Sequence, residues 1–178
     1  MEYPQNVILV DSNDNELGYM EKLEAHQKGL LHRAFSIFLF NKKGEWLLQK
    51  RSNIKYHSAG LWSNACCSHP APGEMNLRSA EKRLNYEMGI ECILIPLFQF
   101  EYKAYFENGL CEHELDHIYY GISDTLPKPE PLEVSGWRYV SPTNLEAELN
   151  QHPENFTVWF RLLFPKVQQA LQLGLFKP

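Results

Sequence analysis

The sequence predicts a mixed α/β fold, in which strands surround one internal helix and further helices follow at the end of the chain. Short segments rich in aromatic and β-branched residues, separated by turns that contain Gly or Pro, recur between residues 7 and 141. Residues 77–88 instead repeat apolar side chains at helical spacing, and two more helical segments follow residue 141. We therefore expect one three-layer domain over residues 1–178, with a core at about 30–141 and a helical extension at about 142–178.

Seven strand segments are expected. In chain order they lie at 7–11, 32–40, 46–51, 61–67, 90–106, 114–123 and 136–141. The pair HRAFSIFLF and WLLQKR is joined by NKKGE, a polar loop with a Gly that is typical of a hairpin. Pro96 interrupts the fifth segment, and the Pro-rich stretch 125–136 is expected to be a surface loop.

The internal helix has a repeating apolar side and defined ends. Its apolar positions are Leu77, Ala80, Leu84 and Met88. Asn76 is expected to cap its N-terminus, because an Asn side chain can accept from the free amides of the first turn, and Gly89 ends the pattern. Residues 142–151 and 155–176 are also expected to be helical, with Pro165 marking a kink or a boundary.

Composition excludes several classes of protein. The chain has no run of about 18 apolar residues, which argues against a membrane span, and its start lacks the features of a secretory signal. We therefore expect a cytoplasmic protein with reduced cysteines. A net charge of −5 argues against binding to a nucleic-acid backbone, but it leaves small anionic molecules open. A monomer is expected.

The stretch NACCSHP at 64–70 places two cysteines beside a histidine. Four cysteines are too few for a disulfide scaffold in a chain of this length, and a bond between neighbours would be strained. Buried packing, half of a metal site and a reactive thiol remain open for Cys66 and Cys67. Because neighbours on a strand face opposite ways, the two thiols are expected to have different surroundings.

Histidines and carboxylates suggest a divalent-metal site. Glu112 and Glu114 alternate along a predicted strand, so they share a face that His113 does not. The candidate ligands are His26, His32, His69, Glu112 and Glu114, a set that could complete a near-octahedral site. The alternative is scattered surface histidines and a solvated strand face. The remaining histidines, His57, His117 and His152, fit no group and are expected to be structural.

Charged and aromatic residues allow two interpretations. Arg83 and Glu87 are four residues apart on the helix, so they form either a surface ion pair or a site for phosphate and Mg²⁺. Scattered cations that would suit a diphosphate are Lys22, Arg51 and Lys55. Tyr102 and Trp159 are either core residues or, through their π-faces, stabilisers of a cation.

Several motifs together resemble one known family. They are KGLLHRAFSIFLFN, LLQKRS, LWSNACCSHP, KRLNYEMG and CEHELDH, in that order, and the likeness runs from about residue 7 to about residue 165. The chain is similar to type I isopentenyl diphosphate isomerases, which have the Nudix fold. Of the Nudix pattern G-x5-E-x7-R-E-x2-E-E-x-G, only Glu74, Glu87 and Gly89 match. The other positions depart from it, which argues against a diphosphate hydrolase.

The resemblance implies a metal-dependent isomerase that interconverts isopentenyl and dimethylallyl diphosphate through a carbocation-like state in isoprenoid synthesis. It implies catalytic roles for Cys67, Glu114 and Tyr102, and contact with the substrate by Lys22, Arg51, Lys55, Arg83 and Trp159. The implied ligands of one divalent metal (Mn²⁺, Zn²⁺ or Mg²⁺) are His26, His32, His69, Glu112 and Glu114. Glu87 is the implied ligand of a Mg²⁺ that arrives with the diphosphate. The alternatives are a Nudix hydrolase and a metal-binding domain without activity.

Overall fold

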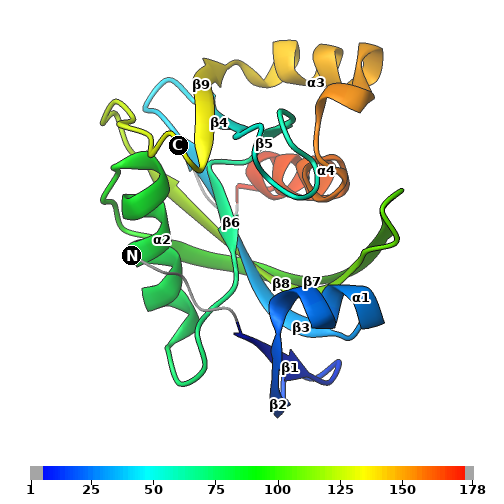
Figure 1. The fold of residues 1–178 in the computed structure, drawn as a ribbon. Coiled ribbons are helices and arrows are strands. Elements are labelled where there is room, and N and C mark those ends of the chain that lie inside the picture. Colours follow the sequence, from blue (N-terminus) through cyan, green and yellow to red (C-terminus); the bar gives the residue numbers. More distant parts are fainter. Residues whose placement is uncertain (1–5, 175–178) are drawn as a thin grey trace.

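The computed structural model describes residues 6–174 as a mixed sheet between helices (Figure 1). The strands are β1 Asn6–Val10, β2 Glu16–Glu21, β3 His32–Phe40, β4 Trp46–Arg51, β5 Trp62–Ser63, β6 Cys66–Ser68, β7 Ile95–Tyr105, β8 Cys111–Ile122 and β9 Val134–Val140. The helices are α1 Lys22–Lys28, α2 Asn76–Met88, α3 Pro142–Gln151, the 3-10 turn Pro153–Asn155 and α4 Val158–Gln172. Helices α2 and α4 lie on opposite sides of the sheet.

Strand β3 lies at the centre of the sheet and is buried on both faces. It pairs antiparallel with β1, β4 and β6 and parallel with β8. Phe35, Ile37 and Leu39 pack in the core that contains α2, whereas Phe38 and Phe40 pack in the core that contains α4. Burial on both faces explains why the sequence of β3 is an almost continuous apolar run.

The predicted three-layer fold is confirmed. The bounds of β3 and β4 agree with the expected hairpin, α2 ends at Gly89 in the left-handed conformation, and residues 123–133 form the expected loop before β9. Strand β2 and helix α1 were not expected. β2 is mostly exposed and therefore has little apolar alternation, and α1 is only 7 residues long.

Three local predictions differ from the structure. Asn76 is the first residue of α2 and not its cap; near this end of the helix, Ser79 Oγ donates to Glu74 Oε2 at 2.5 Å. Helix α4 continues through Pro165, so this residue is not a helix boundary, the second of the two outcomes expected for it; burial of Phe164 and Val167 offsets the hydrogen bond that proline cannot make. Strand β7 starts only at Ile95, five residues later than expected. It includes Pro96, which is tolerated because it lies near the strand end beside a bulge.

The expected helix at 155–176 extends beyond the part of the chain that the structure describes, which ends at residue 174. Among the described residues, none of the helices combines the length and hydropathy that a membrane crossing needs.

Candidate active site

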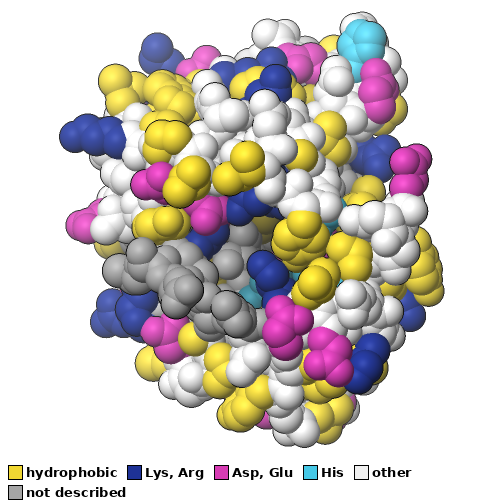
Figure 2. Space-filling model, viewed as in Figure 1, with side chains coloured by type: hydrophobic (Ala, Val, Ile, Leu, Met, Phe, Trp, Pro, Cys, Tyr) yellow, Lys and Arg dark blue, Asp and Glu magenta, His cyan; other side chains and the backbone are white. Residues whose placement is uncertain are grey.

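A cavity opens between α1, the sheet and α4, and Figure 2 shows a hollow on this face with Lys, Arg and His side chains around it. Every residue that the sequence placed in the site lines this cavity except His32, which is fully buried and contacts His26 and Glu114. His117 and His152 lie outside the cavity lining, where their ring nitrogens are 3.0 Å from Asp14 Oδ2 and 3.3 Å from Glu154 Oε1. His57 lines the cavity, so the expectation that it is only structural does not fit its position.

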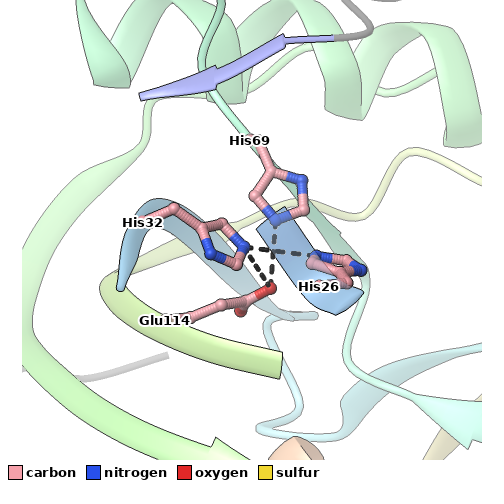
Figure 3. Close-up of side chains that lie close together, drawn as sticks. All are labelled: His26, His32, His69 and Glu114. Carbon is pink, nitrogen blue, oxygen red and sulfur yellow. Dashed lines mark hydrogen bonds and ion pairs between the residues drawn. The ribbon is translucent and has the colours of Figure 1, made fainter. Parts of the chain in front are cut away.

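Three imidazoles and one carboxylate converge at the base of the cavity (Figure 3). The ligand atoms of His26, His32, His69 and Glu114 all lie within 4.8 Å of one another. His26 Nε2 lies 3.2 Å from His32 Nε2, and Glu114 Oε1 lies 3.0 Å from His69 Nε2 and 3.7 Å from His32 Nε2. Such a mixed set of nitrogen and oxygen donors suits a divalent transition metal.

Strand register brings these residues together. In the parallel pairing of β3 with β8, His32 lies directly beside Glu114. Helix α1 ends at Gly29 in the left-handed conformation (φ 60°), and the chain then turns back into β3, so His26 lies over His32. A Cβ at Gly29 would lie 3.2 Å from the sulfur of Cys111, and a residue with a side chain would also be strained at this positive φ, so glycine suits the turn.

The electrostatics of the cluster favour a bound cation. Burial and the neighbouring imidazoles lower the pKa of His26 to about 3, and burial lowers the pKa of His69 to about 4. Burial opposes ionisation of Glu114, but hydrogen bonds with His32 and His69 bring its pKa well below the usual range. The cluster therefore presents neutral imidazoles at His26 and His69 and an ionised carboxylate at Glu114, the protonation states that metal ligands need.

Glu112 lies outside this cluster of four. Glu112 and Glu114 face the same side of β8, as expected, while His113 faces the other side and contacts Glu101 at 3.0 Å. However, Glu112 Oε1 lies 3.2 Å from His57 Nε2, and its carboxylate is not among the clustered ligand atoms of the described residues. Burial and the charge of Glu114 raise the pKa of Glu112 well above its usual range.

Tyr102 and Cys67 border the same cavity. Tyr102 lies opposite Glu114 in the β7–β8 register, and its hydroxyl is 2.7 Å from Glu114 Oε2 and 3.2 Å from Glu112 Oε2. Cys66 packs in the α2 core and Cys67 against the α4 core, so the two thiols have the different surroundings that strand geometry predicted. Burial raises the pKa of Cys67 to about 12, so this thiol keeps its proton at neutral pH.

Positive charge gathers at the other end of the cavity. Lys22, Arg51, Lys55 and Arg83 all line it, and burial together with the charges of Lys55 and Arg83 lowers the pKa of Lys22. Arg83 Nε lies 2.6 Å from Glu87 Oε1, and both side chains are buried, so the pair is not the surface ion pair that the spacing also allowed. An anionic ligand would relieve the repulsion among these cations.

Trp159 closes the cavity from α4 and is 3% exposed. Its indole Nε1 donates to Ser63 Oγ at 2.9 Å, which fixes the ring. The guanidinium of Arg51 lies 5.0 Å from the ring centre, so a π-face of Trp159 already contacts a cation.

Six residues that line the cavity were not predicted as site residues from the sequence. They are Ser36, Gln49, Tyr56, His57, Ser68 and Glu133. Glu133 pairs with both Arg83, at 2.8 Å, and Lys55, and Gln49 donates to Glu87 at 3.1 Å. These residues come from loops or from polar positions of strands, where neither spacing nor periodicity distinguishes them.

The fold is that of Nudix proteins. A family model described as NUDIX domain matches residues 30–160. The crystal structure of DR0079 from Deinococcus radiodurans is similar with a TM-score of 0.75 at 18% identity, covering 90% of this chain and 98% of that one. The NUDIX domain of Shewanella oneidensis NrtR is similar with a TM-score of 0.60 at 16% identity, covering 85% of this chain and 99% of that one. At these identities the likeness concerns the fold.

Relatives with higher sequence identity indicate which class of Nudix protein this chain resembles. An isopentenyl-diphosphate Delta-isomerase of Pectobacterium atrosepticum is 50% identical over 166 residues, which are 93% of each chain. The isopentenyl-diphosphate Delta-isomerase 2 of Aromatoleum aromaticum is 45% identical over 168 residues, 94% of this chain and 89% of that one. The chain therefore belongs to the Nudix family and, within it, to the isopentenyl-diphosphate Delta-isomerases.

Proposed function

We propose that this protein interconverts isopentenyl diphosphate and dimethylallyl diphosphate for isoprenoid biosynthesis, by protonation and deprotonation of the five-carbon chain in the cavity. One observation carries the proposal. A single cavity is lined by a thiol, by a carboxylate hydrogen-bonded to a phenol, and by four cations. The names of the relatives support the same reaction.

The reaction moves a double bond without changing the atoms of the substrate. A proton adds to the terminal carbon of the alkene, positive charge develops at the tertiary carbon, and a different proton leaves the neighbouring carbon. One group must give the first proton and a second group must take the departing one, and we assign these two roles to Glu114 with Tyr102 and to Cys67. General acid–base groups of this kind contribute about 10²–10⁴ in rate.

The cationic carbon must be protected from water and stabilised. Trp159 lies in the wall of the cavity and is nearly fully buried. We assign its indole face to the developing cation, an interaction of roughly 2 kcal/mol or more when desolvated. Tyr102 on β7 is also buried and lines the same cavity, which supports exclusion of water from it.

Divalent metals complete the proposal. His26, His32, His69 and Glu114 would hold one ion, either Mn²⁺, Zn²⁺ or Mg²⁺, which would supply Lewis acidity to the carboxylate. Glu112 is the further ligand that the family resemblance implies. Glu87 would hold a Mg²⁺ that arrives with the diphosphate, while Lys22, Arg51, Lys55 and Arg83 contact the phosphate oxygens.

Proton and phosphorus NMR of isopentenyl diphosphate test the proposal. The substrate is incubated with the protein in D₂O, with Mg²⁺ and trace Mn²⁺. We expect dimethylallyl diphosphate with deuterium incorporated and an unchanged diphosphate signal. Release of phosphate would instead indicate a hydrolase, and folded, metal-loaded protein that leaves the substrate unchanged would refute both activities.

A further inference from the structure

The loop between β4 and β5 places two adjacent side chains in the cavity, although neither belongs to the predicted site. Tyr56 Oη lies 3.1 Å from His26 Nδ1. His57 Nε2 lies 3.2 Å from Glu112 Oε1. One contact therefore ends on a member of the cluster of four, and the other on Glu112, the further ligand that the family resemblance implies.

We propose that Tyr56 and His57 are positioning residues of the metal centre: Tyr56 holds the ring orientation of His26 by accepting a hydrogen bond from Nδ1, and His57 sets the position of the Glu112 carboxylate. The inference rests on the proposed metal-dependent function. The inference adds a set of contacts around the metal ligands and assigns these contacts to the loop between β4 and β5.

The contact of Tyr56 at Nδ1 leaves the other ring nitrogen of His26, Nε2, free to face the cluster. His26 Nε2 faces His32 Nε2 at 3.2 Å and is therefore the atom directed into the cluster. A neutral imidazole that binds a metal through Nε2 must carry its proton on Nδ1, and that proton needs an acceptor. The Tyr56 hydroxyl lies where it can accept this hydrogen bond, and in that arrangement Nε2 keeps its lone pair for the metal.

The ring of Tyr56 is itself held in place. The ammonium of Lys22 lies 5.3 Å from its ring centre, and the ring of His57 meets it edge-on at 4.5 Å. Its backbone carbonyl accepts from Asn108 Nδ2 at 3.2 Å, which ties the loop to the turn between β7 and β8. The hydroxyl can therefore hold His26 at a defined angle.

His57 acts on Glu112 in the same way. Its side chain is 7% exposed and packs between the rings of Tyr56, Phe106 and Trp159, at 4.5, 5.0 and 6.0 Å between ring centres. Nδ1 lies 3.4 Å from Ser58 Oγ, which leaves Nε2–H to donate to Glu112. Because Tyr102 contacts the other carboxylate oxygen at 3.2 Å, both oxygens of Glu112 are fixed.

The loop is anchored on a residue of the proposed diphosphate site. The guanidinium of Arg51 donates to the backbone carbonyls of Ser58 at 3.2 Å and His57 at 3.4 Å. Ser58 adopts the left-handed conformation (φ 50°), an uncommon one for a residue with a side chain. Arg51 thus links the positioning loop to the cationic end of the cavity.

The first variant is Tyr56→Phe, which removes one oxygen and leaves the ring. Co²⁺ is the probe, and its affinity is measured by visible absorption in competition with a chelator. We expect a loss of about 10–100-fold, the usual effect of removing such a contact, with turnover recovered by excess metal. The matched control is Tyr19→Phe. Tyr19 is 54% exposed and Tyr56 is 44% exposed, but Tyr19 lies outside the cavity lining.

The second test compares His57→Gln with His57→Asn. A Gln amide can place its N–H near the position of Nε2, whereas the shorter Asn amide cannot. We expect His57→Asn to weaken Co²⁺ binding and to change the absorption spectrum of bound Co²⁺, and His57→Gln to stay within about threefold of the unsubstituted protein. Equal losses in both variants would mean that His57 only fills space, and would overturn its assignment.

The outcomes separate this inference from the proposed function. If the unsubstituted protein binds no Co²⁺, the metal centre itself is wrong. If it binds Co²⁺ and both Tyr56→Phe and His57→Asn bind it equally well with an unchanged spectrum, the positioning roles alone are refuted. Thermal unfolding of every variant in the absence of metal confirms that each comparison is made on folded protein.

Discussion

Replacement of Tyr102 by Phe tests the carboxylate–phenol pair most directly. The hydroxyl lies 2.7 Å from Glu114 Oε2, and Tyr102 is 6% exposed, so water cannot replace it without rearrangement. Hydrogen bonds to charged groups contribute about 1.5–3 kcal/mol. At about 1.36 kcal/mol for each factor of ten in rate, kcat should fall roughly 10–150-fold if the stabilisation by this contact is realised in the transition state and not in the ground state.

The assay is the rate of dimethylallyl diphosphate formation by proton NMR, with metal content measured on the same samples. We expect KM to stay within about threefold, because Tyr102 does not contact the cationic end of the cavity in our assignment. Tyr105→Phe is the control, since Tyr105 lies on the same strand and is 74% exposed. A kcat for Tyr102→Phe within twofold of the unsubstituted protein would refute the role of the phenol.

Three further predictions test other parts of the structure. Cys67→Ser should lower kcat by about 10²–10⁴ at constant metal content, because a hydroxyl is a weaker acid than the thiol it replaces. The control Cys66→Ala should keep the turnover of the unsubstituted protein. Equal turnover of the two variants in the NMR assay would exclude a catalytic role for Cys67. Glu133→Gln removes the carboxylate that Lys55 and Arg83 share. Calorimetry should therefore show a free energy of unfolding lower by about 1–3 kcal/mol, and pyrophosphate should restore part of it. An unchanged melting temperature would contradict this prediction. Phe160→Ala opens the α4 core and should cost about 3–5 kcal/mol, roughly 6–20 °C in melting temperature, and a shift below about 3 °C would mean that the core collapses around the gap.

Much of the fold was predictable because local pattern and tertiary environment agree. The apolar run of β3 and the helical spacing of α2 are consequences of burial, so sequence periodicity reports them faithfully. Pro165 shows the limit of local rules, since packing of the neighbouring side chains keeps α4 intact through a residue that usually ends a helix. β2 escaped prediction because an exposed edge strand needs no apolar pattern.

The sequence by itself determined which residue types could form the site. Strand alternation predicted that Glu112 and Glu114 share a face and that Cys66 and Cys67 do not, and both follow from the period of two residues in any strand. The motif resemblance then selected His26, His32 and His69 among the seven histidines of the chain.

Only the tertiary structure decided how these residues meet. The parallel pairing of β3 with β8 places His32 beside Glu114, and no local spacing encodes a register between segments so distant in the chain. The same holds for the loop of Tyr56 and His57, whose contacts with His26 and Glu112 depend on where a long connection folds back over the sheet. Local sequence sets the conformation and the face of each segment, whereas distances between segments depend on how the whole core packs.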